Sequence, residues 1–240
     1  MSLFGPPNVE KMVAKKNLKG LLKALVYHRD RPKRESPDYE RSRAVRRMAA
    51  QALGALGDAS AFGSLLESLR DVCPKVREAA AHALARIDQD RAVTSLLGRL
   101  KPEQTEACKS AAEALGHLGD ARATEPLAAL LNQTQYDTLL AAIEALGKLN
   151  DAKAVQPLIG ALIAHDYPAR KAAVSALDRL GQPEWKEWVK GDENDFARLG
   201  ESGDPRVLAP LTKALKVGSE DTRKSAALPL GIIRARNRLG

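Results

Sequence analysis

The sequence contains few aromatic residues, few cysteines and no long apolar run. Aromatic side chains make up 4% of the 240 residues, whereas hydrophobic residues of all kinds make up 44%, with alanine and leucine dominant. Because strands favour β-branched and aromatic residues, this composition predicts closely packed helices. The two cysteines, Cys73 and Cys108, lie in no paired motif. We therefore expect reduced thiols in a cytoplasmic protein, not a disulfide framework.

The chain also lacks sequence signals for membranes. Its first residues, MSLFGPPNVEKMVAKK, include no apolar core of a signal peptide, and no apolar stretch approaches the roughly 18 residues of a membrane-spanning helix. The net charge of +8 is concentrated at the ends: residues 1–47 carry +8, residues 219–240 carry +3 and residues 48–218 carry −3. This distribution favours acidic partners but provides no continuous basic stripe for a nucleic acid duplex.

One segment pattern recurs along the chain at a fixed interval. Its central leucines follow one another every 31 residues, at Leu53, Leu84, Leu115, Leu146 and Leu177. A further copy follows out of phase at Leu199, and Leu230 lies 31 residues beyond it. Such a period is the sequence signature of a repeat architecture, in which each unit buries its apolar faces against its neighbours.

Each copy is predicted to form two helices joined by a tight turn. In the second copy, Val76, Ala80 and Leu84 share one apolar face of a helix over about residues 75–87. Left-handed glycines are expected just past this first helix, at Gly57, Gly119 and Gly181. Aspartates then cap the second helix, at Asp58, Asp120, Asp151 and Asp204. Prolines fall within its first turns, at Pro126, Pro157 and Pro210.

Three segments carry the repeat most clearly: VREAAAHALARI (76–87), AAEALGHLGDARATEPLAALL (111–131) and GDPRVLAPLTKAL (203–215). The unit resembles HEAT repeats, specifically the short HEAT-like repeats of phycobilin (phycobilisome) lyases. The resemblance implies an all-α fold, an α-solenoid in which about seven helix pairs form a right-handed superhelix with a concave and a convex surface. It also implies that the first helix of each pair lines the concave surface and that Asp71 and Arg77 join a stabilising ladder, which is broken in later units because Cys108 and Leu139 stand at the position of the arginine.

We predict a single domain over residues 1–240. Its parts are N-terminal cap helices with a charged loop at about 28–43 (1–43), regular repeats (44–182), a shortened irregular repeat (183–218) and a C-terminal cap helix (219–240). The charged loop is either a basic arm for an acidic surface or a solvated loop. The rings of Trp185 and Trp188 either fill the gap left by the shortened repeat or form an aromatic patch for a ligand.

The sequence favours a non-enzymatic role over an enzymatic one. Deoxyhypusine hydroxylase, an enzyme built from HEAT-like repeats, holds iron with His-Glu pairs, and none of the four histidines here (His28, His82, His117 and His165) precedes a glutamate. Neither cysteine lies near a second cysteine or a suitably spaced histidine, so we predict no metal site and no cofactor. The resemblance leaves open a subunit of a lyase-like or chaperone-like assembly that acts on a tetrapyrrole-bearing protein.

We predict a scaffold that binds a partner protein on its concave face. Cationic or potentially cationic residues occupy outward positions of the first helices, and we take these as partner-binding residues: Arg47, Arg86, His117, Lys148, Lys171 and Arg179. Such a row fits an acidic helix or an extended acidic peptide. The same residues could instead follow the helix dipole, which favours cations near the C-terminus of a helix. Nucleic acid binding through the basic ends is an alternative; we expect a monomer and no membrane partner.

Overall fold

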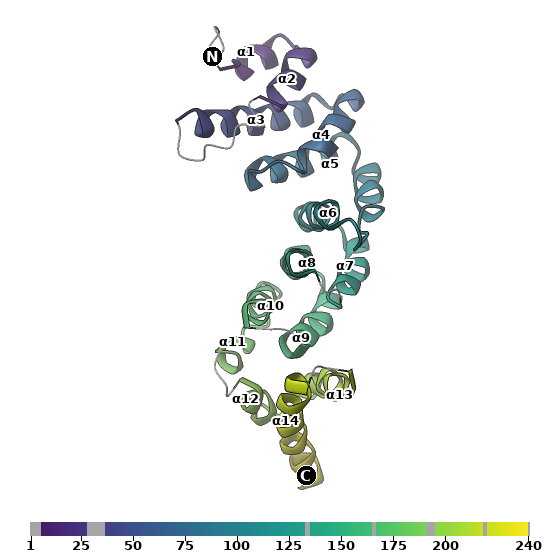
Figure 1. Cartoon of the computed structure of the whole chain (residues 1–240). Coiled ribbons are helices and arrows are strands. Elements are labelled where there is room, and N and C mark those ends of the chain that lie inside the picture. Colours follow the sequence, from purple (N-terminus) through teal and green to yellow (C-terminus); the bar gives the residue numbers. More distant parts are fainter. Residues whose placement is uncertain are drawn as a thin grey trace. The chain divides into compact units, whose positions relative to one another are not determined.

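The computed structural model describes residues 6–27, 37–132, 135–164, 167–190, 195–217 and 220–239. Within these residues the regular structure is entirely helical, and no strand is present (Figure 1). The predicted all-α repeat fold is therefore confirmed. The chain divides into two compact units, which we call the N-terminal unit (Met1–Leu118) and the C-terminal unit (Gly119–Gly240).

The N-terminal unit is a stack of helix pairs. Its helices are α1 (Val9–Ala14), α2 (Leu18–Leu25), α3 (Pro37–Leu56), α4 (Phe62–Ser68), α5 (Pro74–Leu97) and α6 (Thr105–Leu118). Helix α3 packs against α2 and α5, and α5 packs against α4 and α6, so α3, α5 and α6 form successive layers (Figure 1). Leu53, Leu84 and Leu115 are completely buried between these layers. The recurring leucine therefore forms the core that each repeat shares with the next.

Helix α3 begins earlier than the sequence indicated. We expected this helix to start near residue 44, after a charged loop at about 28–43, but it starts at Pro37. Proline is favoured in the first turn of a helix, and Asp38 and Glu40 place negative charge there. The Ser42 hydroxyl donates a hydrogen bond of 3.0 Å to the Tyr27 carbonyl, which ties the added turn to the chain before it. The rest of the predicted loop, 28–36, lies outside the described residues.

The C-terminal unit contains the remaining helices. They are α7 (Thr124–Leu130), α8 (Tyr136–Leu149), α9 (Val155–Ala164), α10 (Tyr167–Arg179), α11 (Trp185–Trp188), α12 (Asp195–Glu201), α13 (Leu208–Val217) and α14 (Glu220–Leu239). Helix α8 packs against α7 and α10, α9 packs against α10 and α13, and α14 packs against α12 and α13. Leu146, Leu177 and Leu199 are completely buried. The out-of-phase copy at Leu199 thus contributes to a core of the same kind.

The turns within the repeats follow the predicted chemistry. Gly57, Gly119 and Gly181 all have a left-handed φ, between 68° and 74°, and Asn150 takes the equivalent place with φ 54°. The predicted aspartate caps each accept a hydrogen bond from the backbone N–H two residues ahead: Asp58, Asp120, Asp151 and Asp204. In each case the aspartate caps a short 3₁₀ turn that leads directly into the second helix. The second copy has no glycine, and its turn is made instead by the extended backbone of Asp88 within α5.

Close helix contacts depend on the glycine that follows a central leucine. A Cβ atom added to Gly54 would lie 2.6 Å from the Cα atom of Ala83, and one added to Gly147 would lie 2.7 Å from the Cβ atom of Ala176. Gly200 meets Pro229 in the same way, at 2.6 Å. Because no real side chain tolerates such distances, the axes of α3 and α5, and of α8 and α10, can approach this closely only with glycine at these positions.

Candidate functional site

A cavity of about 440 Å³ opens between α3 and α5 in the N-terminal unit. Its lining consists of Arg47 and Gln51 from α3 and, from α5, Lys75, Glu78, Ala79, His82, Ala83 and Arg86. Three of these side chains are cationic and one is a carboxylate. The cavity therefore has a positive balance of charge, although the middle of the chain, residues 48–218, is slightly acidic.

The helical repeat explains why these side chains gather on one face. Glu78, His82 and Arg86 follow one another at intervals of four residues, so they lie along one side of α5. Val76 and Leu84, on the other side of α5, are completely buried. The apolar face that holds α5 in the core thus fixes which polar side chains face the cavity.

Arg47 is the least satisfied group in the lining. Its side chain is partly buried, and its Nε atom is buried without a hydrogen-bond partner among the residues that the structure describes. Burial of a guanidinium N–H without an acceptor is costly. Arg47 also lines the cavity, so its guanidinium contributes to the positive charge that a bound molecule would meet there.

His117, from α6, extends the cluster to a third helix. Its Nδ1 atom lies 3.9 Å from Oε1 of Glu78, and its ring lies edge-on to the ring of His82, with 5.9 Å between centroids. One ligand atom from each of Glu78, His82 and His117 lies within 4.8 Å of the other two. The sequence, from which we predicted no metal site, gives no sign of this grouping, because the two histidines come from different repeats and from different positions within the repeat.

The structure places the six predicted partner-binding residues in two groups. Arg47 and Arg86 line the cavity, with His117 beside it. Lys148, on α8, is half-buried, whereas Lys171 and Arg179, on α10, are exposed; all three belong to the C-terminal unit. Sequence reasoning did not select Lys75, Glu78 and His82, although the four-residue spacing of Glu78, His82 and Arg86 was a visible signal.

The family is decided by comparison with sequence models. The model for HEAT repeats matches residues 38–113 and 103–178, which together span more than half of the chain. The chain belongs to the HEAT repeat family. The predicted resemblance to HEAT repeats is thereby confirmed, and the cavity lies between the first helices of two successive HEAT units.

Several solved structures resemble this HEAT protein. A designed armadillo repeat protein in complex with the peptide (KR)4 shares 21% identity, covering 90% of this chain and 99% of its own, with a TM-score of 0.39. The complex of CpcE and CpcF of phycocyanin lyase from Nostoc shares 21% identity, covering 94% and 85%, with a TM-score of 0.38. Human deoxyhypusine hydroxylase shares 17% identity, covering 96% and 100%, with a TM-score of 0.26. No curated protein matches.

A ladder of ion pairs connects the HEAT units of the N-terminal unit. The Asp71 carboxylate receives two hydrogen bonds from the guanidinium of Arg46, at 2.7 and 3.1 Å, and both side chains are almost fully buried. Arg77 donates to the Asp71 carbonyl at 3.0 Å and to Oε2 of Glu113, on the next unit, at 2.6 Å. Asp71 and Arg77 thus both belong to a ladder, as the resemblance implied, but the carboxylate of Asp71 binds the arginine of the preceding unit.

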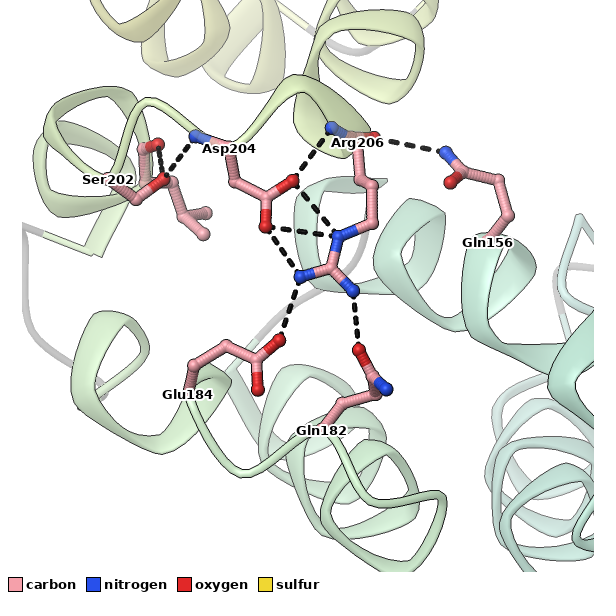
Figure 2. Close-up of polar contacts among 7 residues, drawn as sticks. Gln156, Gln182, Glu184, Ser202, Asp204 and Arg206 are labelled. Atoms are coloured by element: carbon pink, nitrogen blue, oxygen red, sulfur yellow. Dashed lines mark hydrogen bonds and ion pairs between the residues drawn. The ribbon is translucent and has the colours of Figure 1, made fainter.

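In the shortened HEAT repeat, Arg206 is the centre of a polar cluster (Figure 2). The Arg206 guanidinium donates to Asp204, Glu184 and Gln182, and the Arg206 carbonyl accepts from Gln156. The hydrogen bonds to Asp204 and Glu184 raise the pKa of Arg206, and the hydrogen bond from Arg206 lowers the pKa of Asp204. Each of these polar groups is satisfied within the protein, which makes the cluster structural.

Trp185 lies beneath this cluster. Its ring is completely buried, and the guanidinium of Arg206 lies 5.2 Å from the ring centroid. The indole therefore fills the space left by the shortened repeat, one of the two predicted roles. The side chain of Trp188 lies outside the described residues.

The two cysteine thiols are the remaining candidates for chemistry. Cys73 and Cys108 are free and buried, and burial together with the charge of Glu103 raises the pKa of the Cys108 thiol. A raised pKa lowers the fraction of reactive thiolate.

Among the described helices, none is both long enough and apolar enough to cross a membrane.

Proposed function

We propose that this HEAT protein is a scaffold that binds an acidic segment of a partner protein, and that an acidic side chain of the partner enters the cavity between α3 and α5. One observation carries the proposal: the cavity is lined by Arg47, Lys75 and Arg86 against the single carboxylate of Glu78.

A carboxylate is the group that best fits this lining. It accepts hydrogen bonds only, whereas arginine and lysine side chains only donate them. A hydrogen bond between such charged groups is about twice as strong as one between neutral groups. The three cations also attract an acidic segment before contact, so electrostatics would set the association rate and the register of binding.

The cationic residues of the C-terminal unit belong to the same proposal. Lys148 on α8 and Lys171 and Arg179 on α10 offer contacts to an acidic segment within the C-terminal unit, taken by itself. That such a segment runs along a concave face remains a prediction, as does the monomeric state. A scaffold of this kind needs no catalytic group, and we assign none.

The test is a fluorescence anisotropy titration with a panel of labelled peptides of equal length and graded charge, from glutamate-rich to lysine-rich. We expect the acidic peptides to bind and the basic ones not to bind. The affinity should fall as salt is added, because salt screens the interaction of exposed charges. The variant Arg47→Glu/Arg86→Glu should lose binding by at least about tenfold, equivalent to about 1.4 kcal/mol.

The matched control reverses the same number of charges elsewhere on the N-terminal unit. Arg70 and Lys101 are exposed and lie outside the cavity, so Arg70→Glu/Lys101→Glu should retain the affinity of the unaltered protein. An equal loss in both double variants would mean that only total charge matters. Tighter binding of single-stranded DNA than of any acidic peptide would replace the proposal with the nucleic acid alternative.

A further inference from the structure

We propose that Glu78, His82 and His117 form a binding site for a divalent transition-metal ion of the zinc type, which joins α5 to α6. The sequence alone predicts no metal site, and binding of an acidic segment does not depend on one. The basis is the placement of two imidazoles and one carboxylate around a common point, with one ligand atom of each within 4.8 Å of the other two.

The set of donor atoms selects the class of metal. Imidazole nitrogen suits zinc, copper and nickel, whereas magnesium and calcium prefer sites built from oxygen alone. Two histidines and a glutamate also form a recurring protein ligand set of zinc sites that leave a fourth position open to water or another molecule. The cluster therefore fits a zinc-type ion with an open position.

The backbone already holds the three side chains in the required order. Glu78 and His82 are one turn apart on α5, so both point to the same side of that helix. His117 approaches from α6, which packs directly against α5. The ion would therefore connect two successive repeats and not merely two residues of one helix.

The ligand atoms lie somewhat farther apart than a bound ion requires. Metal–ligand bonds of about 2.0–2.2 Å in a tetrahedral site place the ligand atoms roughly 3.3 Å apart, and the Glu78–His117 distance is 3.9 Å. The Glu78 side chain is 49% exposed and that of His117 is 22% exposed, so neither belongs to the buried core. Glu113 is the carboxylate of α6 closest to His117 in the sequence. It is already paired with Arg77, so we do not count it as a ligand.

The surrounding charges set the expected character of the site. Lys75 and Arg86 line the cavity beside Glu78 and His82, and like charge near a metal ion lowers its affinity. The same cations would favour an anion in the open coordination position. We therefore expect reversible binding of one ion per chain and not a permanent structural ion.

The experiment uses the full chain without a histidine tag, freed of metal with EDTA and then dialysed. Zn²⁺ is titrated by calorimetry, and Co²⁺ is titrated by its visible absorption. We expect one ion per chain and an increase in the unfolding temperature on addition of Zn²⁺. His82→Ala and His117→Ala should each weaken binding by at least about tenfold. Removal of a residue that only supports a metal ligand already lowers metal affinity by about that factor.

The chain provides its own matched control. The variant His28→Ala/His165→Ala removes the other two histidines, and Cys73→Ser/Cys108→Ser removes both thiols; each should bind Zn²⁺ as the unaltered protein does. Circular dichroism checks that His82→Ala, at an exposed position, remains folded. The site is refuted if the unaltered chain fails to bind Zn²⁺ or Co²⁺ at millimolar concentration, or if the His82 and His117 variants bind as tightly as the control. A thiolate band in the Co²⁺ spectrum would assign the ion to the cysteines and would equally refute the site.

Discussion

At the scale of single residues, the stack depends on places where a side chain is missing. Gly147 meets Ala176 of the next repeat so closely that a methyl group would lie 2.7 Å from it. Gly160, also within a helix of the C-terminal unit, has open space within 4 Å of the point that a methyl group would occupy. The two glycines therefore separate the effect of close packing from the effect of helix propensity.

We expect Gly147→Ala to lower the free energy of unfolding by about 1–3 kcal/mol, because overpacking forces the helices apart. Gly160→Ala should leave this free energy unchanged or raise it by up to about 1 kcal/mol, because alanine favours the helix. Urea denaturation measures both. Equal effects of the two substitutions would show that the contact between α8 and α10 does not limit packing.

The Arg46–Asp71 pair is the second feature at this scale, since both side chains are only 1% exposed. Asp71→Asn leaves the guanidinium buried without its counter-charge and should cost about 3–5 kcal/mol of stability. Arg43→Ala breaks the exposed pair with Glu40 on the same helix and should cost less than about 1 kcal/mol. The account of the ladder fails if the two variants unfold at the same urea concentration.

At the scale of elements, the helix ends are controlled by the aspartate caps. Hydrogen bonds lower the pKa of Asp204, chiefly from Arg206, and that of Asp151, chiefly from Thr124. A carboxyl group with a lowered pKa in the folded state contributes stability at pH values above its unfolded pKa of about 3.9. That contribution is lost as the pH falls through the lower pKa of the folded state.

The contribution of these caps to the unfolding temperature should therefore stay constant from about pH 7 to pH 5. It should fall below about pH 4. Asp204→Asn can still cap the 3₁₀ turn but loses the charge that pairs with Arg206. Thermal unfolding followed by circular dichroism should show that this variant is less stable at pH 7 and loses less stability on acidification. If the unfolding temperature falls equally on acidification in both proteins, the role of Asp204 is contradicted.

The turns were predictable because their chemistry is local. A left-handed φ at Gly119 and a cap at Asp120 follow from what the backbone needs at a helix end, and both are present. The start of α3 was placed late because the charged segment before it was interpreted as a loop, although Pro37 and the acidic residues after it favour a first turn. The cluster of Glu78, His82 and His117 depends on the rotation and offset of α6 against α5, which a repeat pattern does not contain.

At the scale of the whole molecule, the repeat period determines which residues meet without determining what they bind. Regular spacing places Arg47 on α3 and Arg86 on α5 at the same cavity, although they are far apart in the sequence. The ladder residues Arg46 and Asp71 connect the same successive repeats through their buried side. Within the N-terminal unit, polar side chains of α3 and α5 thus line the cavity while the buried Arg46–Asp71 pair holds the same repeats together.

The central claim is that an acidic side chain of a partner enters the cavity beside Arg86. The most direct measurement is a charge-exchange cycle. Calorimetry measures the affinity of one acidic peptide from the panel, and of its variants with single glutamates changed to lysine. Each peptide is titrated into the unaltered protein and into Arg86→Glu. We predict that Arg86→Glu weakens binding by at least about tenfold and that one lysine variant of the peptide restores most of the loss, a coupling of at least about 1.4 kcal/mol. If the loss of binding free energy for every lysine peptide on Arg86→Glu equals the sum of the two separate losses, the acidic side chain does not meet Arg86 and the claim is contradicted.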